Sequence, residues 1–450
     1  MALTASHPKA YDALTASQAK AYDAICEGGN VFLTGAGGTG KSFLIEYIKN
    51  NLNHKRIAVT ALTGCAALLL GCGAKTLHSW AGIGLGKESA EALAAKIKKN
   101  TRARKSWRQS DILIIDEISM MPADLFDKLS LIAQIVRGST RSFGGLQLIL
   151  VGDFFQLPPI EVSPTGRQYV FESDAWKAAI TTTIELEEVK RQSDPQFKAI
   201  LNEARIGRIS EEHLAVLNGR KGLNWKDNQI KPTLLFSRRA EVDTINETNL
   251  KSLSGPFHTY NANLLNVGAD CNYNLKDPNL LYDVEQMDKA AQYQGTLVLA
   301  EGAQVMLIYN LDMEMGLVNG SRGVVVGFQK GKGGTMCPRV MFKDTTRLID
   351  ENDWPLENYP GVARRQIPLI LAYAQTIHKC QGSTLDSALI DIGRRTFEYG
   401  QAYVALSRVK SLDSLYIWDL NPSAFKVHAK VLEFYDGIRG GAVAEAAKVP

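Results

Sequence analysis

The sequence predicts an α/β protein with two α/β regions, each built on a mostly parallel sheet, and a smaller β-rich unit inserted into the second region. Three observations predict this fold class. Short apolar segments alternate with longer helical patterns up to about residue 190, which indicates βαβ units. Two further apolar segments, 234–237 and 369–374, look like strands of a second such sheet. Between them, residues 295–328 are rich in Val, Gly and Leu in short alternating runs, and a glycine turn cluster follows.

The elements of the first region can be placed in order. A helix begins near Ser17 and ends at Glu27. Strands buried on both faces are predicted where apolar residues run without a charge. The predicted strands are 30–33, 57–61, 112–115 and 146–151, and a helix is predicted at 41–51. Residues 255–295 show no clear period, and the Gly- and Ala-rich tail after Asp436 is expected to fray.

Composition excludes several classes of protein. The 450 residues are 45% hydrophobic and 22% charged, which argues against a disordered, collagen-like or coiled-coil chain. The longest apolar runs, 65–70 and 369–374, are far shorter than the roughly 20 residues of a membrane helix. The N-terminus lacks the basic start and apolar segment of a secretory signal. The six cysteines form no CxxC pair. We therefore expect free thiols, no membrane partner and a cytoplasmic protein, nucleoid-associated if the source is bacterial or viral.

The net charge does not identify a partner. The chain has 51 Lys and Arg residues and 47 Asp and Glu residues, so its net charge is 51 − 47 = +4. If nucleic acid binds, local groups of basic residues must bind it. One run stands out because it holds seven basic residues and no acid: Lys96, Lys98, Lys99, Arg102, Arg104, Lys105 and Arg108. A phosphate-contacting patch and a solvated helix face are both open interpretations of this run.

The strongest motif is a glycine-rich loop between an apolar strand and an apolar helix. It consists of Gly35, Ala36, Gly37, Gly38, Thr39, Gly40, Lys41 and Ser42. The glycines let successive backbone N–H groups turn toward phosphate, and the helix N-terminus adds partial positive charge. In such a loop Lys41 reaches the β and γ phosphates and Ser42 holds Mg²⁺. The loop predicts a nucleoside triphosphate with Mg²⁺.

Two acids end a later apolar strand, and they indicate hydrolysis rather than storage of the nucleotide. Asp116 and Glu117 follow the strand 112–115. Carboxylates at the carboxyl end of a parallel strand face the crevice where ligands bind. Asp116 is expected to hold Mg²⁺, and Glu117 to orient or deprotonate the attacking water. No Asn-Lys-x-Asp motif occurs, which weakens a GTPase switch as an alternative.

Three further side chains narrow the class of hydrolase. Gln156 follows the strand 146–151, where its amide could sense the γ-phosphate. Arg191 and Arg408 are candidate arginine fingers, which neutralise charge that develops on the transferred phosphoryl group. Taken alone, an arginine of this kind is more often part of a surface ion pair.

At this point the chain resembles a superfamily-one helicase of the RecD-like branch, and closely the Pif family of 5′-to-3′ DNA helicases. The motifs occur in order from about residue 14 to 420 and leave out most of 250–295. They are 14–18, which resembles the adenine-reading Q motif with Gln18, then 61–67, 76–80, 116–120 with 124–129, 302–307 with 317–323, 372–384 and 401–408. Gln381 and Gly382 lie in the motif that resembles motif five, and the resemblance adds them and Gln18 to the ATP site.

The resemblance implies two RecA-like domains with ATP between them, a small accessory element and an inserted β-barrel-like domain. The implied boundaries are 1–72 with 109–190 for the first motor domain and 191–255 with 366–436 for the second. The accessory element is 73–108, with 82–86 as a candidate wedge loop, the β-rich domain is 256–365, and the tail is 437–450. The implied activity is ATP-driven, Mg²⁺-dependent unwinding of duplex DNA from 5′ to 3′. Roles in replication, repair, recombination and telomere or G-quadruplex maintenance are open.

Single-stranded DNA and its junctions with duplex are the implied partners, bound by a monomer. The expected contacts are Thr63, Gly64, His78, Trp80, Thr376, His378 and Lys379. Hydroxyl groups and histidines can donate to phosphate, and planar rings can stack on bases without reading sequence. Three alternatives remain open: a motor on RNA or RNA–DNA hybrids, an ATP-gated binding protein without motor activity, and a nuclease-helicase, for which no extra acidic domain is apparent.

Overall fold

The computed structural model describes residues 13–446 except 85, 161–165, 167, 226, 229, 269–270, 313 and 357–358. They form two compact units. Unit 1 comprises the described residues up to Leu214, the segment Phe397–Ser407 and the described residues from Asn421 onwards; unit 2 comprises Ala215–Thr396 and Arg408–Leu420. Residues 1–12 of the predicted first domain, residue 85 of the candidate wedge loop and residues 447–450 of the predicted tail lie outside the described residues.

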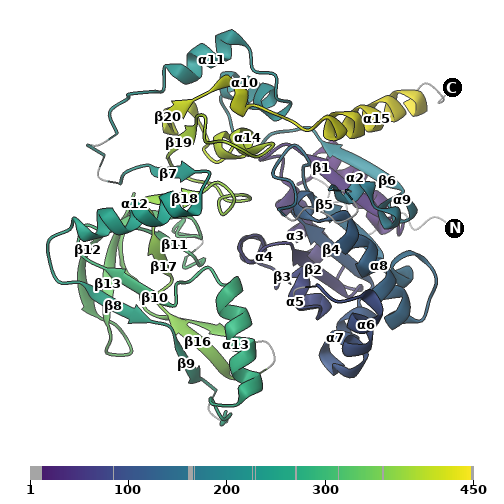
Figure 1. The fold of residues 1–450 in the computed structure, drawn as a ribbon, viewed down its shortest axis with the longest axis horizontal. Coiled ribbons are helices and arrows are strands. Elements are labelled where there is room, and N and C mark those ends of the chain that lie inside the picture. The colour runs from purple at the N-terminus through teal and green to yellow at the C-terminus, as the bar shows by residue number, and fades with distance from the viewer. Residues whose placement is uncertain are drawn as a thin grey trace. The chain divides into compact units, whose positions relative to one another are not determined.

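A six-stranded parallel sheet forms the centre of unit 1 (Figure 1). Its order is β3-β2-β4-β5-β1-β6, and every neighbouring pair is parallel. The strands are β1 Val31–Gly35, β2 Ile57–Ala61, β3 Lys75–Thr76, β4 Ile112–Asp116, β5 Gln147–Val151 and β6 Thr182–Leu186. Because all six run in one direction, the segments that follow β1, β4 and β5 begin at the same edge of the sheet.

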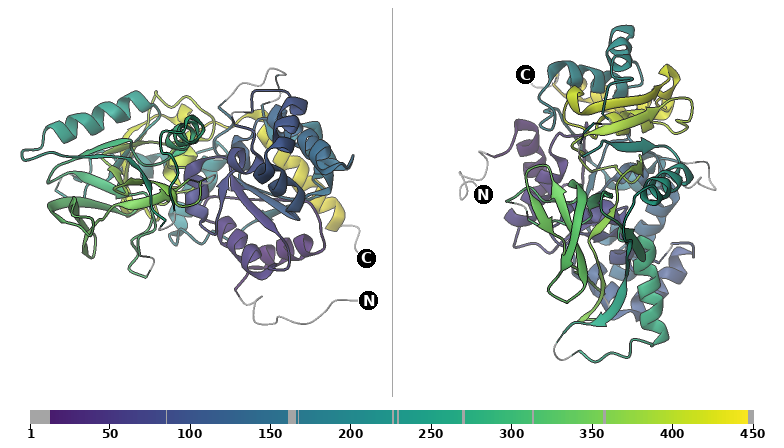
Figure 2. Two further views of the ribbon diagram at one scale, coloured as in Figure 1. Left: turned by 90° about the horizontal axis from the view of Figure 1, so that it is seen from below. Right: turned by 90° about the vertical axis from the view of Figure 1, so that its left-hand side faces the viewer.

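Side chains alternate along β4 and β5 between two apolar layers, which explains why these two strands have no polar face. In β4, Ile112 and Ile114 belong to one buried cluster, and Leu113 and Ile115 belong to the other. The first cluster includes residues of α2, α3 and α4, and the second includes residues of α6 to α9, so helices cover both faces (Figure 2). Such strands are typical of a doubly covered parallel sheet.

The helices of unit 1 follow the strands in the expected βαβ pattern. They are α2 Ala16–Cys26, α3 Lys41–Asn51, α4 Gly64–Leu70, α5 Leu77–Ala81, α6 Ala90–Lys99, α7 Thr101–Gln109, α8 Ala123–Arg137, α9 Asp174–Ala179, α10 Pro195–Arg205, α14 Gln401–Leu406 and α15 Ala429–Ala446. The chain passes into unit 2 within α11, Glu211–Asn218. Short 3-10 turns occur at Ile118–Met120, Ser142–Gly145, Val170–Glu172, Leu412–Ser414 and Pro422–Ala424. None of the described helices is both long and apolar enough to cross a membrane.

Unit 2 contains a parallel sheet and three antiparallel sheets. The parallel sheet has the order β18-β7-β19-β20, with β7 Thr233–Phe236, β18 Ala374–Thr376, β19 Ala388–Ile392 and β20 Leu415–Leu420. The largest antiparallel sheet has the order β14-β13-β12-β11-β17, with β11 Gln304–Leu307, β12 Arg322–Lys330, β13 Met336–Phe342, β14 Thr346–Leu348 and β17 Leu369–Leu371. The smaller ones join β9 Asn263–Asn266, β15 Asn352–Pro355 and β16 Val362–Gln366, and β8 His258–Asn261 with β10 Thr296–Leu299. Two helices, α12 Arg239–Lys251 and α13 Pro278–Ala290, complete the unit. The predicted α/β class with an inserted β unit is confirmed.

Three details differ from the sequence-based expectations. The apolar segment 369–374 is not one strand of the parallel sheet, because β17 pairs antiparallel with β11 and only β18 pairs parallel with β7. The tail from 437 to 446 is helical, as the second half of α15, because buried Val431 and Tyr435 anchor that helix. Segments 191–214, 397–407 and 421–436, expected in the second motor domain, cluster with unit 1. The remaining domain boundaries stay predictions.

Candidate nucleotide-binding and nucleic-acid-binding sites

The glycine-rich loop connects β1 to α3 and depends on its glycines. Gly38 and Gly40 have φ values of 88° and 85°, in the left-handed region that favours glycine. A Cβ atom on Gly38 would lie 2.5 Å from Cβ of Arg191, and one on Gly40 would lie 2.7 Å from Nε2 of Gln18. The loop is therefore shaped by backbone conformations and close approaches that other residues cannot adopt.

Lys41 is the first residue of α3, and its amine lies under the loop. The Nζ atom donates to the carbonyl oxygens of Gly35 at 2.6 Å and Ala36 at 3.0 Å. Burial lowers the pKa of Lys41, while the carboxylates of Asp153, Glu117 and Asp116 act in the opposite direction. The amine thus lies within the field of three acids from the neighbouring strand ends.

Asp116 and Glu117 lie at the carboxyl end of β4, and both are buried. Glu117 has φ 55° and ψ 40°, a left-handed conformation that costs energy for a non-glycine residue and is often found at functional sites. Burial raises the pKa of Asp116 to about 7, and the negative charge of Glu117 adds to the effect. Negative charge on two buried acids is costly, and a bound cation would stabilise it.

Gln18 and Gln156 border the same edge of the sheet. Thr15 caps α2, and Gln18 completes the capping box by accepting from the Thr15 N–H at 3.0 Å. The Gln18 Nε2 atom donates to the Thr39 carbonyl at 3.4 Å, so α2 is attached to the loop. Gln156 is buried after β5, with its N–H donating to the Asp153 carbonyl at 2.9 Å.

The two candidate arginine fingers have different surroundings. Arg191 lies against the loop, because its N–H donates to the Gly38 carbonyl at 3.2 Å and its Nη1 donates to the Ser407 carbonyl at 3.1 Å. Arg408 is buried in unit 2, where its Nη1 donates to the carbonyls of Cys380 and Ser383, both at 3.1 Å. Arg408 thus holds the turn that contains Gln381 and Gly382.

The residues predicted to contact a nucleic-acid strand lie in both units, in loops or near the ends of helices and strands. In unit 1, Thr63 accepts from the Ala66 N–H at 3.1 Å and precedes Gly64, the first residue of α4, while half-buried His78 lies in α5. In unit 2, Thr376 ends β18, followed by half-buried His378 and exposed Lys379. These positions are compatible with the prediction that the threonine hydroxyls and histidine imidazoles contact a nucleic-acid strand.

Trp80 does not fit the stacking role predicted for it. Its side chain is only 7% exposed and packs on Trp107 with the ring centroids 4.7 Å apart. The Trp107 Nε1 atom in turn donates to the Ala81 carbonyl at 2.9 Å. Trp80 therefore joins α5 to α7 in the core, and this part of the stacking prediction is wrong.

Comparison with known proteins decides the family. A model of the PIF1-like helicase family matches residues 13–222, and one of the DNA helicase Pif1 2B domain matches residues 289–328. The crystal structure of the Pif1 helicase from Candida albicans is 36% identical, has a TM-score of 0.77, and the match covers 94% of this chain and 99% of that one. The chain belongs to the PIF1-like helicase family. The predicted resemblance and the two RecA-like domains are thereby confirmed.

Two other members of the PIF1-like family set the scale of the similarity. The ATP-dependent DNA helicase PIF1 of Danio rerio is 41% identical over 418 residues, which cover 92% of this chain and 62% of that protein. The chain therefore spans about three fifths of the length of that curated relative. The Bacteroides Pif1 helicase in complex with ADP-AlF3 and single-stranded DNA is 26% identical with a TM-score of 0.66, covering 95% of this chain and 97% of that one.

Tyr403 contacts the glycine-rich loop, and the sequence did not predict this contact. Its buried hydroxyl accepts from the Gly37 N–H at 2.8 Å. The only available signal was its place in the 401–408 motif.

We expect Tyr403→Phe to lower the free energy of unfolding by about 1 kcal/mol, because the Gly37 N–H loses its partner. Urea unfolding measures this, with Tyr282→Phe as the control because Tyr282 is 61% exposed; equal effects of the two changes would contradict the expectation.

A buried ionic network beyond the carboxyl end of β5 was also missed. Asp153 is fully buried, and Arg205 donates to both of its carboxylate oxygens at 2.9–3.3 Å. The Arg205 Nη1 atom also donates to Glu185 at 3.1 Å. The Tyr435 hydroxyl of α15 lies 2.6 Å from the Thr34 hydroxyl and 3.4 Å from Asp153. Because Thr34 directly precedes Gly35, this network joins α10 and α15 to the start of the loop.

Proposed function

We propose that the chain is an ATP-dependent DNA helicase that moves 5′ to 3′ along single-stranded DNA and unwinds duplex. The observation that supports it best is the placement of Lys41 among Asp116, Glu117 and Asp153 at one sheet edge. The complex of the Bacteroides relative with ADP-AlF3 and single-stranded DNA supports the choice of both ligands. The 5′-to-3′ direction rests on the resemblance to the Pif family alone.

The residues of unit 1 have distinct proposed roles in ATP turnover. The backbone N–H groups of residues 35–42 bind the phosphates, and Lys41 exchanges its two carbonyl partners for phosphate oxygens. Glu117 accepts the proton of the attacking water, or orients that water. Gln156 contacts the γ-phosphate, and Gln18 contacts the adenine. Arg191, already against Gly38, contributes positive charge close to the phosphates.

Ser42 and Asp116 are the residues that we propose to hold Mg²⁺. This ion prefers oxygen ligands and commonly takes one or two carboxylates together with substrate phosphates. The described residues hold no cluster of three or more His, Cys, Asp or Glu suited to a metal. The buried acid pair fits such a cation because charge on Asp116 is costly without one. When bound, Mg²⁺ supplies positive charge that neutralises the phosphates.

In unit 2, Arg408 and the turn at 380–383 are proposed to complete the response to ATP. The guanidinium donates to the carbonyls of Cys380 and Ser383, so any movement of Arg408 toward phosphate also releases the turn with Gln381 and Gly382. The same turn follows Thr376 and His378, the proposed strand contacts. ATP binding and grip on the strand are thereby linked through one short segment.

Unwinding of tailed duplexes tests the proposed function. We expect duplexes with a single 5′ tail to be separated in the presence of ATP and Mg²⁺, and duplexes with a single 3′ tail to remain paired. ATP turnover should rise on addition of single-stranded DNA, with a matched RNA strand as the comparison. Equal unwinding from both tails would contradict the direction, and turnover indifferent to any strand would favour a binding protein without motor activity.

A further inference from the structure

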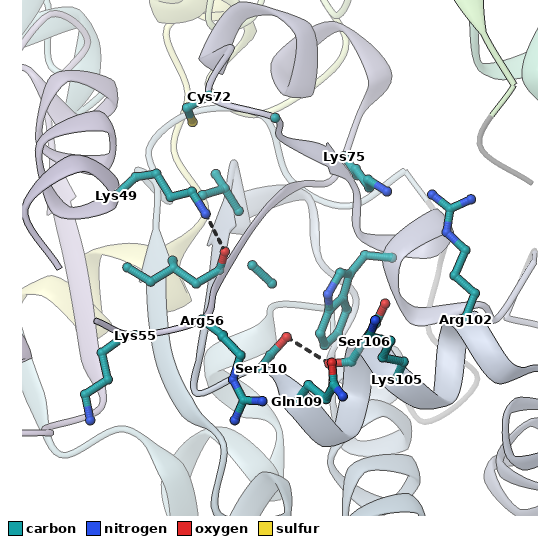
Figure 3. Close-up of a pocket in the computed structure, with 15 residues that line it drawn as sticks. Lys49, Lys55, Arg56, Cys72, Lys75, Arg102, Lys105, Ser106, Gln109 and Ser110 are labelled. Carbon is teal, nitrogen blue, oxygen red and sulfur yellow. Dashed lines mark hydrogen bonds between the residues drawn. The ribbon is translucent and has the colours of Figure 1, made fainter. Parts of the chain in front are cut away.

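A strongly basic pocket lies on unit 1, outside the nucleotide site. Its volume is about 560 Å³, and it extends over the start of β2, the edge strand β3 and the helix α7 (Figure 3). Six basic side chains line it: Lys49, Lys55, Arg56, Lys75, Arg102 and Lys105. No acid is among its lining residues, all of which the structure describes. The chain as a whole has a net charge of only +4, so a disproportionate share of positive charge gathers here.

Two of the basic side chains of the pocket contact neighbouring groups. Arg56 pairs with Asp111 at 3.2 Å in a mostly exposed ion pair, and this contact holds the pKa of Asp111 below its usual range. The Lys49 amine donates to the Ile57 carbonyl at 2.8 Å, which keeps its charge intact. The lining of the pocket thus contains six basic side chains and no acid. Such a density favours a polyanionic ligand.

The pocket accounts for only part of the basic run at 96–108. In α7, Arg102, Lys105, Ser106 and Gln109 line the pocket, spaced as residues on one face of a helix. Ala103 and Trp107, between them, are buried in the core. The basic residues Lys98, Lys99 and Arg108 are exposed but do not line the pocket. Only some of the basic residues of α7 therefore line the pocket.

The basic side chains of the pocket are spread along strand β2 and its neighbour β3. Arg56 precedes β2, and Lys75 pairs with Thr60 near the other end of that strand. At about 3.3 Å per residue these positions are about 13 Å apart, a length over which a nucleic-acid backbone presents more than one phosphate. Lys75 also directly precedes Thr76 and α5, which contains the proposed strand contact His78. The pocket thus borders the proposed single-strand site.

The chemistry of the walls favours duplex over single strand. Binding of single strands relies on exposed aromatic faces on which bases stack. The one aromatic residue that lines the pocket is Trp80, and it is buried against Trp107. The remaining polar lining, such as Ser106 and Gln109, suits phosphate oxygens. We propose that this pocket binds the phosphate backbone of duplex DNA next to the junction, an inference that rests on the proposed DNA helicase function.

A charge-matched pair of variants tests the pocket. The test variant is K55Q/R102Q/K105Q, and the control is K98Q/K99Q/R108Q; both remove three exposed positive charges from unit 1. Binding to a 5′-tailed duplex and to the single strand alone is measured over a range of salt concentrations. Since each duplex phosphate contact contributes about 0.9 to the slope of log K against log salt, we expect the test variant to reduce the slope for the tailed duplex by about 2–3. Its binding to the single strand and its strand-stimulated ATP turnover should stay as in the wild type.

The outcomes separate this inference from the proposed function. If the control variant lowers the slope as much as the test variant, or if neither changes it, the pocket is not a duplex site. An equal loss of single-strand binding by the test variant would also overturn the proposal, because the occupant would then be the single strand. A wild-type chain that unwinds tailed duplexes while showing one of these results retains the helicase function. A wild type that binds no DNA refutes both.

Discussion

Glu117→Gln is expected to abolish ATP turnover while leaving ATP binding nearly unchanged. The substitution keeps the size of the side chain and its buried position, but it removes the group that accepts a proton from the attacking water. General-base catalysis typically contributes about 10²–10⁴ to the rate, so kcat should fall by that factor. The Lys41 amine and the loop N–H groups, which we propose to bind the phosphates, are unaffected. Single-turnover ATP hydrolysis and binding of a fluorescent ATP analogue measure the two properties separately.

The control for this experiment is Glu27→Gln. Glu27 is an exposed residue at the end of α2, so its substitution should leave turnover unchanged. Strand separation should be lost in the Glu117 variant together with turnover, because translocation depends on hydrolysis. Residual turnover within a factor of two of the wild type would show that Glu117 is not the base. Loss of ATP binding together with turnover would instead indicate a structural role for its left-handed backbone.

The local structure of the proposed nucleotide site was predictable because its signals lie close together in the sequence. The strand, the glycines and the helix that shape the loop lie within about 20 consecutive residues, and Gly38 and Gly40 have left-handed backbone conformations that favour glycine. Asp116 and Glu117 were recognised in the same way, as acids that end an apolar strand. The parallel sheet then brings these local segments to one edge, since the direction of every strand is the same.

What escaped prediction depends on partners far apart in the chain. The hydroxyl of Tyr435 reaches Asp153 across 282 positions, and nothing near either residue indicates the other. Trp80 looked like a stacking platform until Trp107, from a different helix, was seen to bury it. The glycines and alanines after Asp436 suggested fraying, but burial of Val431 and Tyr435 determines where that helix lies. Composition and hydrophobic periodicity do not predict such tertiary contacts.

Arg205→Met is expected to be among the most destabilising single substitutions in unit 1. The guanidinium is the main partner of a carboxylate, Asp153, that has no exposed surface. Burial lowers the pKa of Arg205, but the charge of Asp153, the neighbouring Tyr435 and Tyr403 and the hydrogen bond to Asp153 together raise it above its ordinary value. Removal of one partner of a buried ion pair leaves the other charge uncompensated and costs about 3–5 kcal/mol. For a unit of this size, that corresponds to a fall in Tm of roughly 6–20 °C.

The matched control is Arg208→Met, at an exposed arginine three positions further along. It should change Tm by no more than 1–2 °C, since exposed charges contribute little. The double variant Asp153→Asn/Arg205→Met should recover part of the loss, because the buried negative charge is then absent as well. If Arg205→Met proved no worse than Arg208→Met, the network would be incidental. If instead the loss is large and ATP affinity falls with it, the reason is structural continuity. Asp153 contacts Tyr435, Tyr435 contacts Thr34, and Thr34 precedes the first glycine of the glycine-rich loop. Helix α15, although it comes from the end of the chain, would then be a supporting part of the nucleotide site.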